Sequence, residues 1–305
     1  MLGSSKINFR NAFLTCYLTS RKYSTKPFVN LSYELNDKYK SSQALVIAHG
    51  LFASKENWRS LAKRINDLTK LKVYTVDLRN HGDSRPYMPN MTYIDMANDL
   101  ENFVNKIVIE KGKVDHITLM GHSMGGKTVM SLALKEIVGP LNVDQIIVAD
   151  ISPNVSPSLI NIKSYLEKMK SIDMNSVGQT LIQARKEIDK ILCDLPNLKK
   201  DVHQRQFILT RLKEENGNIR WNFNLDAIMT HYQDIMNFPA FKNQYHNPAL
   251  FLGGERSDYI TEKDLPEVEK YFTYYKFVKI PRAGHVIHFD NPTATLNAIK
   301  NFICF

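Results

Sequence analysis

The strongest constraint on the fold is a series of six short apolar segments, each followed by turn or polar residues. They occupy residues 44–48, 73–76, 117–120, 146–149, 249–252 and 277–280. Apolar runs of this length predict strands buried on both faces of a sheet. Between them, apolar residues at three- and four-residue spacing predict helices around Trp58–Ile65 and Ile94–Ile107. Alternating strands and helices predict an α/β fold with a mostly parallel central sheet flanked by helices.

One predicted strand runs directly into a serine motif. Residues 117–120 are followed by Gly121-His122-Ser123-Met124-Gly125, a Gly-x-Ser-x-Gly pattern that a helix can continue. A serine between a buried strand and a helix sits on a tight, strained turn that exposes its hydroxyl, and small flanking residues allow the turn to pack closely. This context predicts that Ser123 is a nucleophile that forms an acyl-enzyme.

A serine hydroxyl needs a base to take its proton, and nine histidines compete for that role. His285 follows the last predicted strand and satisfies the chain order of nucleophile, acid and histidine. His122 lies inside the serine motif, where its ring would point away from the hydroxyl. His288 fits a packing or surface position better. His285 is therefore the predicted base.

Two aspartates are placed to be the third member of the triad. Asp150 ends the strand 146–149, and Asp258 follows the strand 249–252. Either carboxylate could hold the imidazole in its productive tautomer and stabilise the imidazolium. Each could instead cap a loop through local backbone amides. The residues alone leave this choice open.

An oxyanion hole requires two backbone amides that point at the developing charge. The residue after the nucleophile, Met124, supplies one of them. The second is expected from the loop after the first predicted strand, His49-Gly50-Leu51-Phe52. Leu51 is the preferred donor, and Phe52 is close behind it.

The alternation of strands and helices stops between Ser152 and Asn247. This stretch contains no convincing strand but has helical patterns at Leu159–Met169 and Val177–Leu192. An insertion of helices after a core strand predicts a lid over the active site. We therefore expect a core formed by residues 26–152 and 247–305, with a helical lid over residues 153–246.

The amino-terminal segment differs in composition from the rest of the chain. Of the net charge of +9, five positive charges lie within residues 1–33, which contain no acidic residue. A basic, acid-free segment rich in Ser and Thr, with apolar residues between the charges, predicts a mitochondrial presequence over residues 1–25. The expected location is therefore the mitochondrion.

Composition also argues against several other classes. No apolar run approaches the roughly 18–20 residues that span a bilayer, so no transmembrane helix is expected. Beyond the first segment, basic and acidic residues are interleaved, which gives a nucleic-acid partner no support. The three cysteines are scattered, which predicts neither a zinc site nor a disulfide framework. We expect no metal and no resident cofactor, and the oligomeric state stays open.

Four motifs stand out along the chain. They are His49-Gly50-Leu51-Phe52-Ala53-Ser54, Asp77-Leu78-Arg79-Asn80-His81-Gly82-Asp83-Ser84, Gly121–Gly126 and Asp150-Ile151-Ser152-Pro153. Together they resemble one subgroup of the α/β-hydrolases, from about Val29 to Phe302. The subgroup comprises mitochondrial abhydrolases of animals and fungi, related bacterial esterases and yeast ethanol acetyltransferases. Asn57-Trp58-Arg59-Ser60-Leu61 and the composition look most like the acetyltransferases.

The resemblance implies an α/β-hydrolase fold and favours Asp150 as the triad acid, because it opens the Asp-x-Ser-Pro motif. It also implies acyl transfer: acetyl-CoA, as a substrate, would acylate Ser123, and ethanol would accept the acetyl group to give ethyl acetate. Esterase and thioesterase side activities would accompany this reaction. The first alternative is a mitochondrial carboxylesterase or thioesterase with water as the acceptor. The second, of another class, is a non-catalytic binding protein with a hydrolase fold.

Overall fold

The computed structural model describes residues 28–135, 141–155 and 162–303. The predicted presequence, residues 1–25, lies outside the described residues, as does the first part of the helical pattern predicted from Leu159. Within the described ranges, no helix is long and apolar enough to cross a membrane.

A seven-stranded sheet forms the centre of the molecule, in the order β1-β3-β2-β4-β5-β8-β9. All neighbouring pairs are parallel except β1 with β3. The six predicted strands are all present, so the expected α/β fold with a mostly parallel sheet is confirmed. The strands are β1 (Tyr33–Asn36), β2 (Gln43–Ala48), β3 (Lys72–Val76), β4 (His116–His122), β5 (Gln145–Ala149), β8 (Ala249–Gly254) and β9 (Tyr275–Ile280).

Strand β1 is absent from the prediction. Its sequence, Tyr-Glu-Leu-Asn, has no apolar run, and its side chains are partly exposed at the edge of the sheet. An antiparallel edge strand needs less apolar character than the buried strands at the centre, so its sequence signal is weak.

Helices bury both faces of the sheet in two separate apolar clusters. Leu45 and Ile47 of β2 belong to the cluster beneath α2 and α13, whereas Val46 and Ala48 belong to the cluster on the opposite face. The alternation of side chains along a strand explains this division. The helices are α2 (Arg59–Thr69), α3 (Tyr93–Phe103) continued by the π-helical η2 (Val104–Lys111), α4 (Met124–Leu134), α11 (Leu265–Tyr271) and α13 (Pro292–Ile303), with short η1 (Lys55–Trp58), η4 (Glu262–Asp264) and α12 (Ile287–Asp290).

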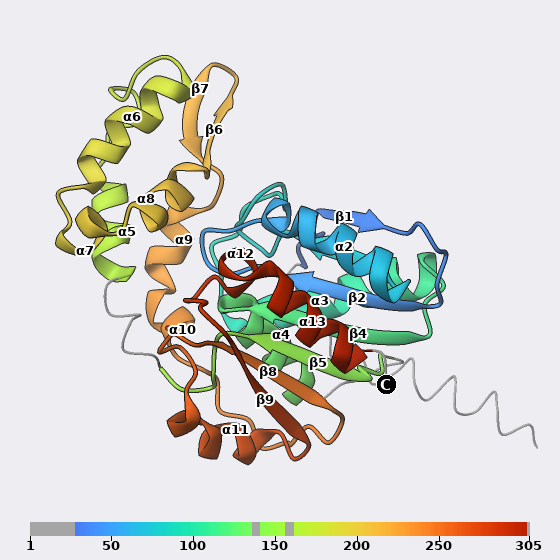
Figure 1. Cartoon of the computed structure of the whole chain (residues 1–305). Helices are drawn as coiled ribbons and strands as arrows, with labels where there is room; N and C mark the ends of the chain where they lie inside the picture. The colour runs from blue at the N-terminus through green and yellow to red at the C-terminus, as the bar shows by residue number, and fades with distance from the viewer. Residues whose placement is uncertain (1–27, 136–140, 156–161, 304–305) are drawn as a thin grey trace, which may run out of the picture.

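Residues 162–236, called the insertion below, form a group beyond the carboxyl ends of the central strands (Figure 1). They are mostly helical, but they also contain an antiparallel hairpin, so the expectation that this stretch has no strand is wrong. The sequence contains Asn216-Gly217, a dipeptide typical of a two-residue hairpin turn. In the structure its φ values are 54° and 77°, as such a turn requires. The elements are α5 (Ile162–Lys170), α6 (Leu181–Leu192), α7 (Pro196–Lys200), α8 (Val202–Leu209), β6 (Leu212–Glu215), β7 (Asn218–Trp221), α9 (Leu225–Thr230) and α10 (Tyr232–Met236).

Two glycines allow the turn between β4 and α4 to form. A Cβ atom added at Gly121 would lie 2.1 Å from the carbonyl oxygen of Gly125. A Cβ atom added at Gly125 would lie 2.4 Å from the carbonyl oxygen of Ala48, at the end of β2. Both obstacles are backbone atoms, which cannot rotate away as a flexible side chain can. The start of α4 is therefore pressed against the end of β2.

We predict that Gly121→Ala lowers the free energy of unfolding by about 3 kcal/mol, the upper end of the usual overpacking cost, because the added methyl group meets fixed backbone atoms. Gly217→Ala is the control: Gly217 has a positive φ of 77° but no atom within 4 Å of its added Cβ, so only backbone strain of about 1–2 kcal/mol is expected. Urea unfolding measures both values. An equal or smaller loss in Gly121→Ala would contradict the packing account.

Candidate active site

Ser123 lies at the turn between β4 and α4, with φ of 52° and ψ of −118°. This conformation is strained for a residue with a side chain, and such strain is characteristic of functional sites. The Ser123 amide donates to the carbonyl oxygen of Ala149 at 3.0 Å, which fixes the turn to the end of β5. The serine is held at the start of a helix, whose unpaired amides favour negative charge nearby.

His285 connects Ser123 to Asp150. Its Nε2 lies 3.1 Å from Ser123 Oγ, and its Nδ1 lies 2.8 Å from Asp150 Oδ2. Asp150 is fully buried at the end of β5, whereas the His285 side chain is 27% exposed. The structure thus brings together the predicted nucleophile, the predicted base and one of the two candidate acids. The arrangement can move a proton from the serine hydroxyl to an imidazole supported by a carboxylate.

The second candidate acid occupies the loop after β8 and has an exposed side chain. The carboxylate at His285 Nδ1 is that of Asp150, not that of Asp258. The loop of Asp258 nevertheless supports the site, because Ser257 Oγ donates to Asp150 Oδ2 at 2.5 Å. The Gly254 amide donates to Asp150 Oδ1 at 2.6 Å. Sequence reasoning missed Ser257, although its proximity to Asp258 placed it in a region already under consideration.

The ring of Tyr259 stacks on the imidazole of His285, with centroids 3.5 Å apart and an interplanar angle of 18°. This contact was also absent from the sequence prediction. A stacked ring fixes the plane of the imidazole and shields one face from water. Together with the Asp150 carboxylate, it leaves His285 few orientations other than the one that faces Ser123.

Two other histidines near the site have packing roles. His122 Nε2 lies 2.8 Å from the carbonyl oxygen of His285, so it holds the backbone of that residue and does not contact the serine hydroxyl through this nitrogen. His288 stacks on Trp58 with centroids 3.9 Å apart. Burial lowers the pKa of His288 to about 3 and the pKa of His122 well below its usual range. Both rings are neutral at physiological pH, in line with the preference for His285 as the base.

The loop after β2 lies beside the nucleophile. A Cβ atom added at Gly50 would lie 3.3 Å from Ser123 Cβ, so glycine permits this approach. The Phe52 amide donates to His81 Nε2 at 3.3 Å and is engaged away from the serine. Leu51 lines the cavity around Ser123 and stays the preferred second oxyanion donor with Met124.

Ser123 and His285 open into a cavity of about 280 Å³ between the core and the insertion. Its walls combine apolar and aromatic side chains with polar groups from the core and the insertion. Such a surface suits an acyl chain next to a reactive ester. The apolar and aromatic lining residues are Leu51, Phe52, Ala53, Trp58, Ile162, Tyr165, Phe207, Tyr259 and Val286, and the polar ones include Asn57, Asp201 and Gln204.

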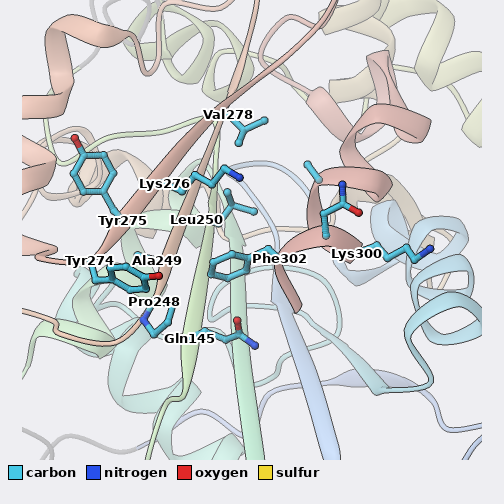
Figure 2. Close-up of a pocket in the computed structure, with 12 residues that line it drawn as sticks. Gln145, Pro248, Ala249, Leu250, Tyr274, Tyr275, Lys276, Val278, Lys300 and Phe302 are labelled. Atoms are coloured by element: carbon cyan, nitrogen blue, oxygen red, sulfur yellow. The ribbon is translucent and has the colours of Figure 1, made fainter. Parts of the chain in front are cut away.

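A larger cavity of about 770 Å³ lies at the opposite ends of the strands, where Gln145, Ala249 and Tyr275 begin β5, β8 and β9 (Figure 2). Its remaining walls come from further residues of β8 and β9, from the residues just before these strands and from α13, including Phe302. None of the predicted site residues lines it, so its greater size does not make it the candidate active site. Among the described residues, no group of three or more histidine, cysteine or acidic side chains could hold a metal ion.

Comparison with known proteins places this geometry in a family. The sn-1-specific diacylglycerol lipase ABHD11 of Danio rerio is 39% identical over 275 residues, which are 90% of this chain and 83% of that protein. Ethanol acetyltransferase 1 of Kluyveromyces marxianus is 27% identical, over 87% of this chain and 75% of that protein. A solved esterase from a marine microorganism has a TM-score of 0.77 and 33% identity, over 90% of this chain and 99% of its own. The family model of the alpha/beta hydrolase fold matches residues 43–292, and the chain belongs to this family.

Proposed function

We propose that this protein is a serine hydrolase that cleaves carboxylic esters through an acyl-Ser123 intermediate, with water as the acceptor. The observation that carries the proposal is the continuous contact from Ser123 Oγ through His285 to the buried carboxylate of Asp150. A scaffold kept only for binding would have no need of this alignment, so the non-catalytic alternative has less support.

The mechanism follows from the positions of the donors and acceptors. His285 Nε2 takes the proton of Ser123 Oγ as the oxygen attacks the ester carbonyl carbon. The amides of Leu51 and Met124 stabilise the resulting oxyanion, and Asp150 stabilises the imidazolium. The C–O bond of the ester breaks, and His285 donates the proton to the departing alcohol. In the second half, His285 removes a proton from water, which attacks the acyl carbon. The bond from that carbon to Ser123 Oγ then breaks, His285 returns the proton to Oγ, and the carboxylic acid is released.

The cavity indicates the class of ester. At about 280 Å³ it lies near the lower end of the range for small-molecule sites, and its walls combine apolar and polar side chains. It therefore suits one acyl chain or a small ester rather than a whole lipid with two chains. The relatives named as an esterase and as a diacylglycerol lipase support a carboxylic ester as the substrate class, and only the esterase fits the small size of the cavity.

Acetyl transfer from acetyl-CoA to ethanol is the second candidate, supported by the relative named as an ethanol acetyltransferase. The same Ser123, His285 and Asp150 serve either acceptor, because only the molecule that attacks the acyl-enzyme differs. The outcome depends on how well the cavity excludes water and holds an alcohol. The ester hydrolase is preferred because the 38–39% identical relatives are named as lipases.

The roles in the triad are tested with three substitutions and a chromogenic short-chain ester. Ser123→Ala is expected to lower kcat by at least about 10⁴-fold, because no acyl-enzyme forms. Asp150→Asn is expected to lower kcat by about 10⁴-fold through loss of the productive imidazole tautomer. Asp258→Asn is the matched control and should keep kcat within about twofold of the wild type, since its side chain is exposed. Full activity in Asp150→Asn would reject its assignment as the triad acid.

The acceptor is tested by supplying the purified protein with acetyl-CoA or a short-chain ester, with and without ethanol. We expect the free acid to be the main product in each case, because water is the proposed acceptor. Gas chromatography of ethyl acetate, measured against free acetate, distinguishes the two routes. Ethyl acetate as the main product at moderate ethanol would overturn the hydrolase proposal in favour of the acetyltransferase.

We also propose a mitochondrial location, on the basis of the basic, acid-free segment that begins the chain. Residues 1–25 fused to a fluorescent protein are expected to direct it to mitochondria in yeast cells. The control fusion replaces Lys6, Arg10, Arg21 and Lys22 with glutamine, which removes the positive charge and should leave the reporter in the cytosol. Equal cytosolic fluorescence from both fusions would refute the presequence.

A further inference from the structure

Two histidines join the loop after β2 to the loop after β3 in a reciprocal arrangement. His49, in the first loop, accepts a hydrogen bond at Nε2 from the amide of Leu78 in the second loop, at 3.0 Å. His81, in the second loop, accepts a hydrogen bond at Nε2 from the amide of Phe52 in the first loop, at 3.3 Å. These four residues are called the histidine clasp below.

Both rings of the clasp have their other nitrogen at a carbonyl oxygen. His49 Nδ1 lies 2.8 Å from the Gly50 oxygen, and His81 Nδ1 lies 3.1 Å from the Arg79 oxygen. A carbonyl oxygen can only accept, so Nδ1 carries the proton in each ring and Nε2 is left as the acceptor. Both rings are fully buried, and this burial lowers the pKa of each histidine to about 3. The rings therefore stay neutral and keep accepting at physiological pH.

The clasp holds two successive peptide planes on either side of Leu51. The Gly50 carbonyl oxygen accepts from His49 Nδ1 and, at 3.1 Å, from the Ala53 amide. In a planar trans peptide the N–H points opposite to the C=O, so fixing the Gly50 oxygen also fixes the direction of the Leu51 N–H. The Leu51–Phe52 peptide plane is held by the hydrogen bond that the Phe52 amide donates to His81 Nε2. Phe52 needs this support because its φ of 60° is unfavourable for a residue with a side chain.

We propose that His81 is a positioning residue, which acts through the Phe52 amide to keep the Leu51 N–H directed at the acyl oxygen of the bound ester. This inference rests on the proposed function, in which Leu51 is an oxyanion donor. Without the acceptor at His81, the Phe52 amide would be buried and unpaired. The Leu51–Phe52 peptide could then rotate and displace Ala53, whose amide donates to the Gly50 oxygen at 3.1 Å. With that bond weakened, the Gly50–Leu51 peptide would be held by His49 Nδ1 alone, and its direction would be less strictly fixed. His81 touches neither the substrate nor the reacting atoms in this role.

The test compares two substitutions that differ in whether they keep an acceptor. In His81→Gln the side-chain oxygen can replace Nε2, whereas His81→Leu fills a similar volume without any acceptor. His81→Leu is expected to lower kcat for the ester by about 10- to 100-fold with KM within about twofold, because a misdirected oxyanion donor weakens only the transition state. His81→Gln should recover most of this loss. Equal kcat losses in the two variants, or none in His81→Leu, would overturn the proposal.

A second readout isolates the oxyanion from general damage to the fold. A trifluoromethyl ketone adds to Ser123 and forms an oxyanion, so its affinity should fall in His81→Leu by the same factor as kcat/KM. Ile65→Ala is the control for lost stability, because Ile65 is a buried residue of α2 and packs on the sheet face away from the clasp. It should lower the melting temperature while leaving kcat and the inhibitor affinity near those of the wild type. Inhibitor affinity unchanged in His81→Leu would count against the inference.

The clasp is also tested without any substrate, which separates it from the proposed function and from variants that fail to fold. In wild-type protein with ¹⁵N-labelled histidine, NMR should show His49 and His81 as neutral Nδ1–H tautomers between pH 5 and 8. A His81 ring that titrates in this range, or that carries its proton on Nε2, would overturn the clasp itself. If the wild type hydrolyses no ester while this spectrum is found, the proposed function fails and the loop geometry still holds.

Discussion

The contact between the start of α4 and the end of β2 is the constraint on which the site depends. No side chain could stand at Gly125, because the carbonyl oxygens of Ala48 and His49 lie 2.4 and 2.5 Å from the position of its Cβ. The same contact sets Ser123 next to the loop that begins at His49. The nucleophile and the predicted oxyanion donor are therefore placed by backbone packing, which few side-chain changes could relax. His285 and Asp150 follow β9 and β5, so they meet Ser123 at the carboxyl ends of the parallel strands.

Most of the core could be predicted from the sequence, because its strands are buried on both faces and must be apolar throughout. The exceptions have physical causes. Strand β1 lies at an edge and is half-exposed, so its four residues carry no apolar run. The hairpin of β6 and β7 was missed because Glu214 and Glu215 resemble part of a helix, although Asn216-Gly217 marked the turn. Here the turn residues were more informative than the composition of the strands.

The site was predictable where a residue is tied to a local motif, and less so where it depends on strand order. Ser123 and His285 follow from their places after β4 and β9. The choice between Asp150 and Asp258 could not be made in this way, because both residues follow parallel strands whose carboxyl ends lie on the same side of the sheet. Ser257 reaches Asp150 only because β5 and β8 are neighbours, a pairing that joins segments on either side of the insertion. Pairings of such long range leave no trace in the local sequence.

Burial explains why one of five histidines around the site can act as a base. His49, His81, His122 and His288 are at most 8% exposed, and desolvation disfavours their charged forms. His285 differs in being partly exposed and in lying 2.8 Å from the Asp150 carboxylate, which can stabilise the imidazolium that forms during turnover. The four neutral rings serve instead as hydrogen-bonding and packing groups whose charge does not change during turnover. Because they carry no charge, the imidazolium formed at His285 meets no like charge from them, and the nearby Asp150 carboxylate stabilises it.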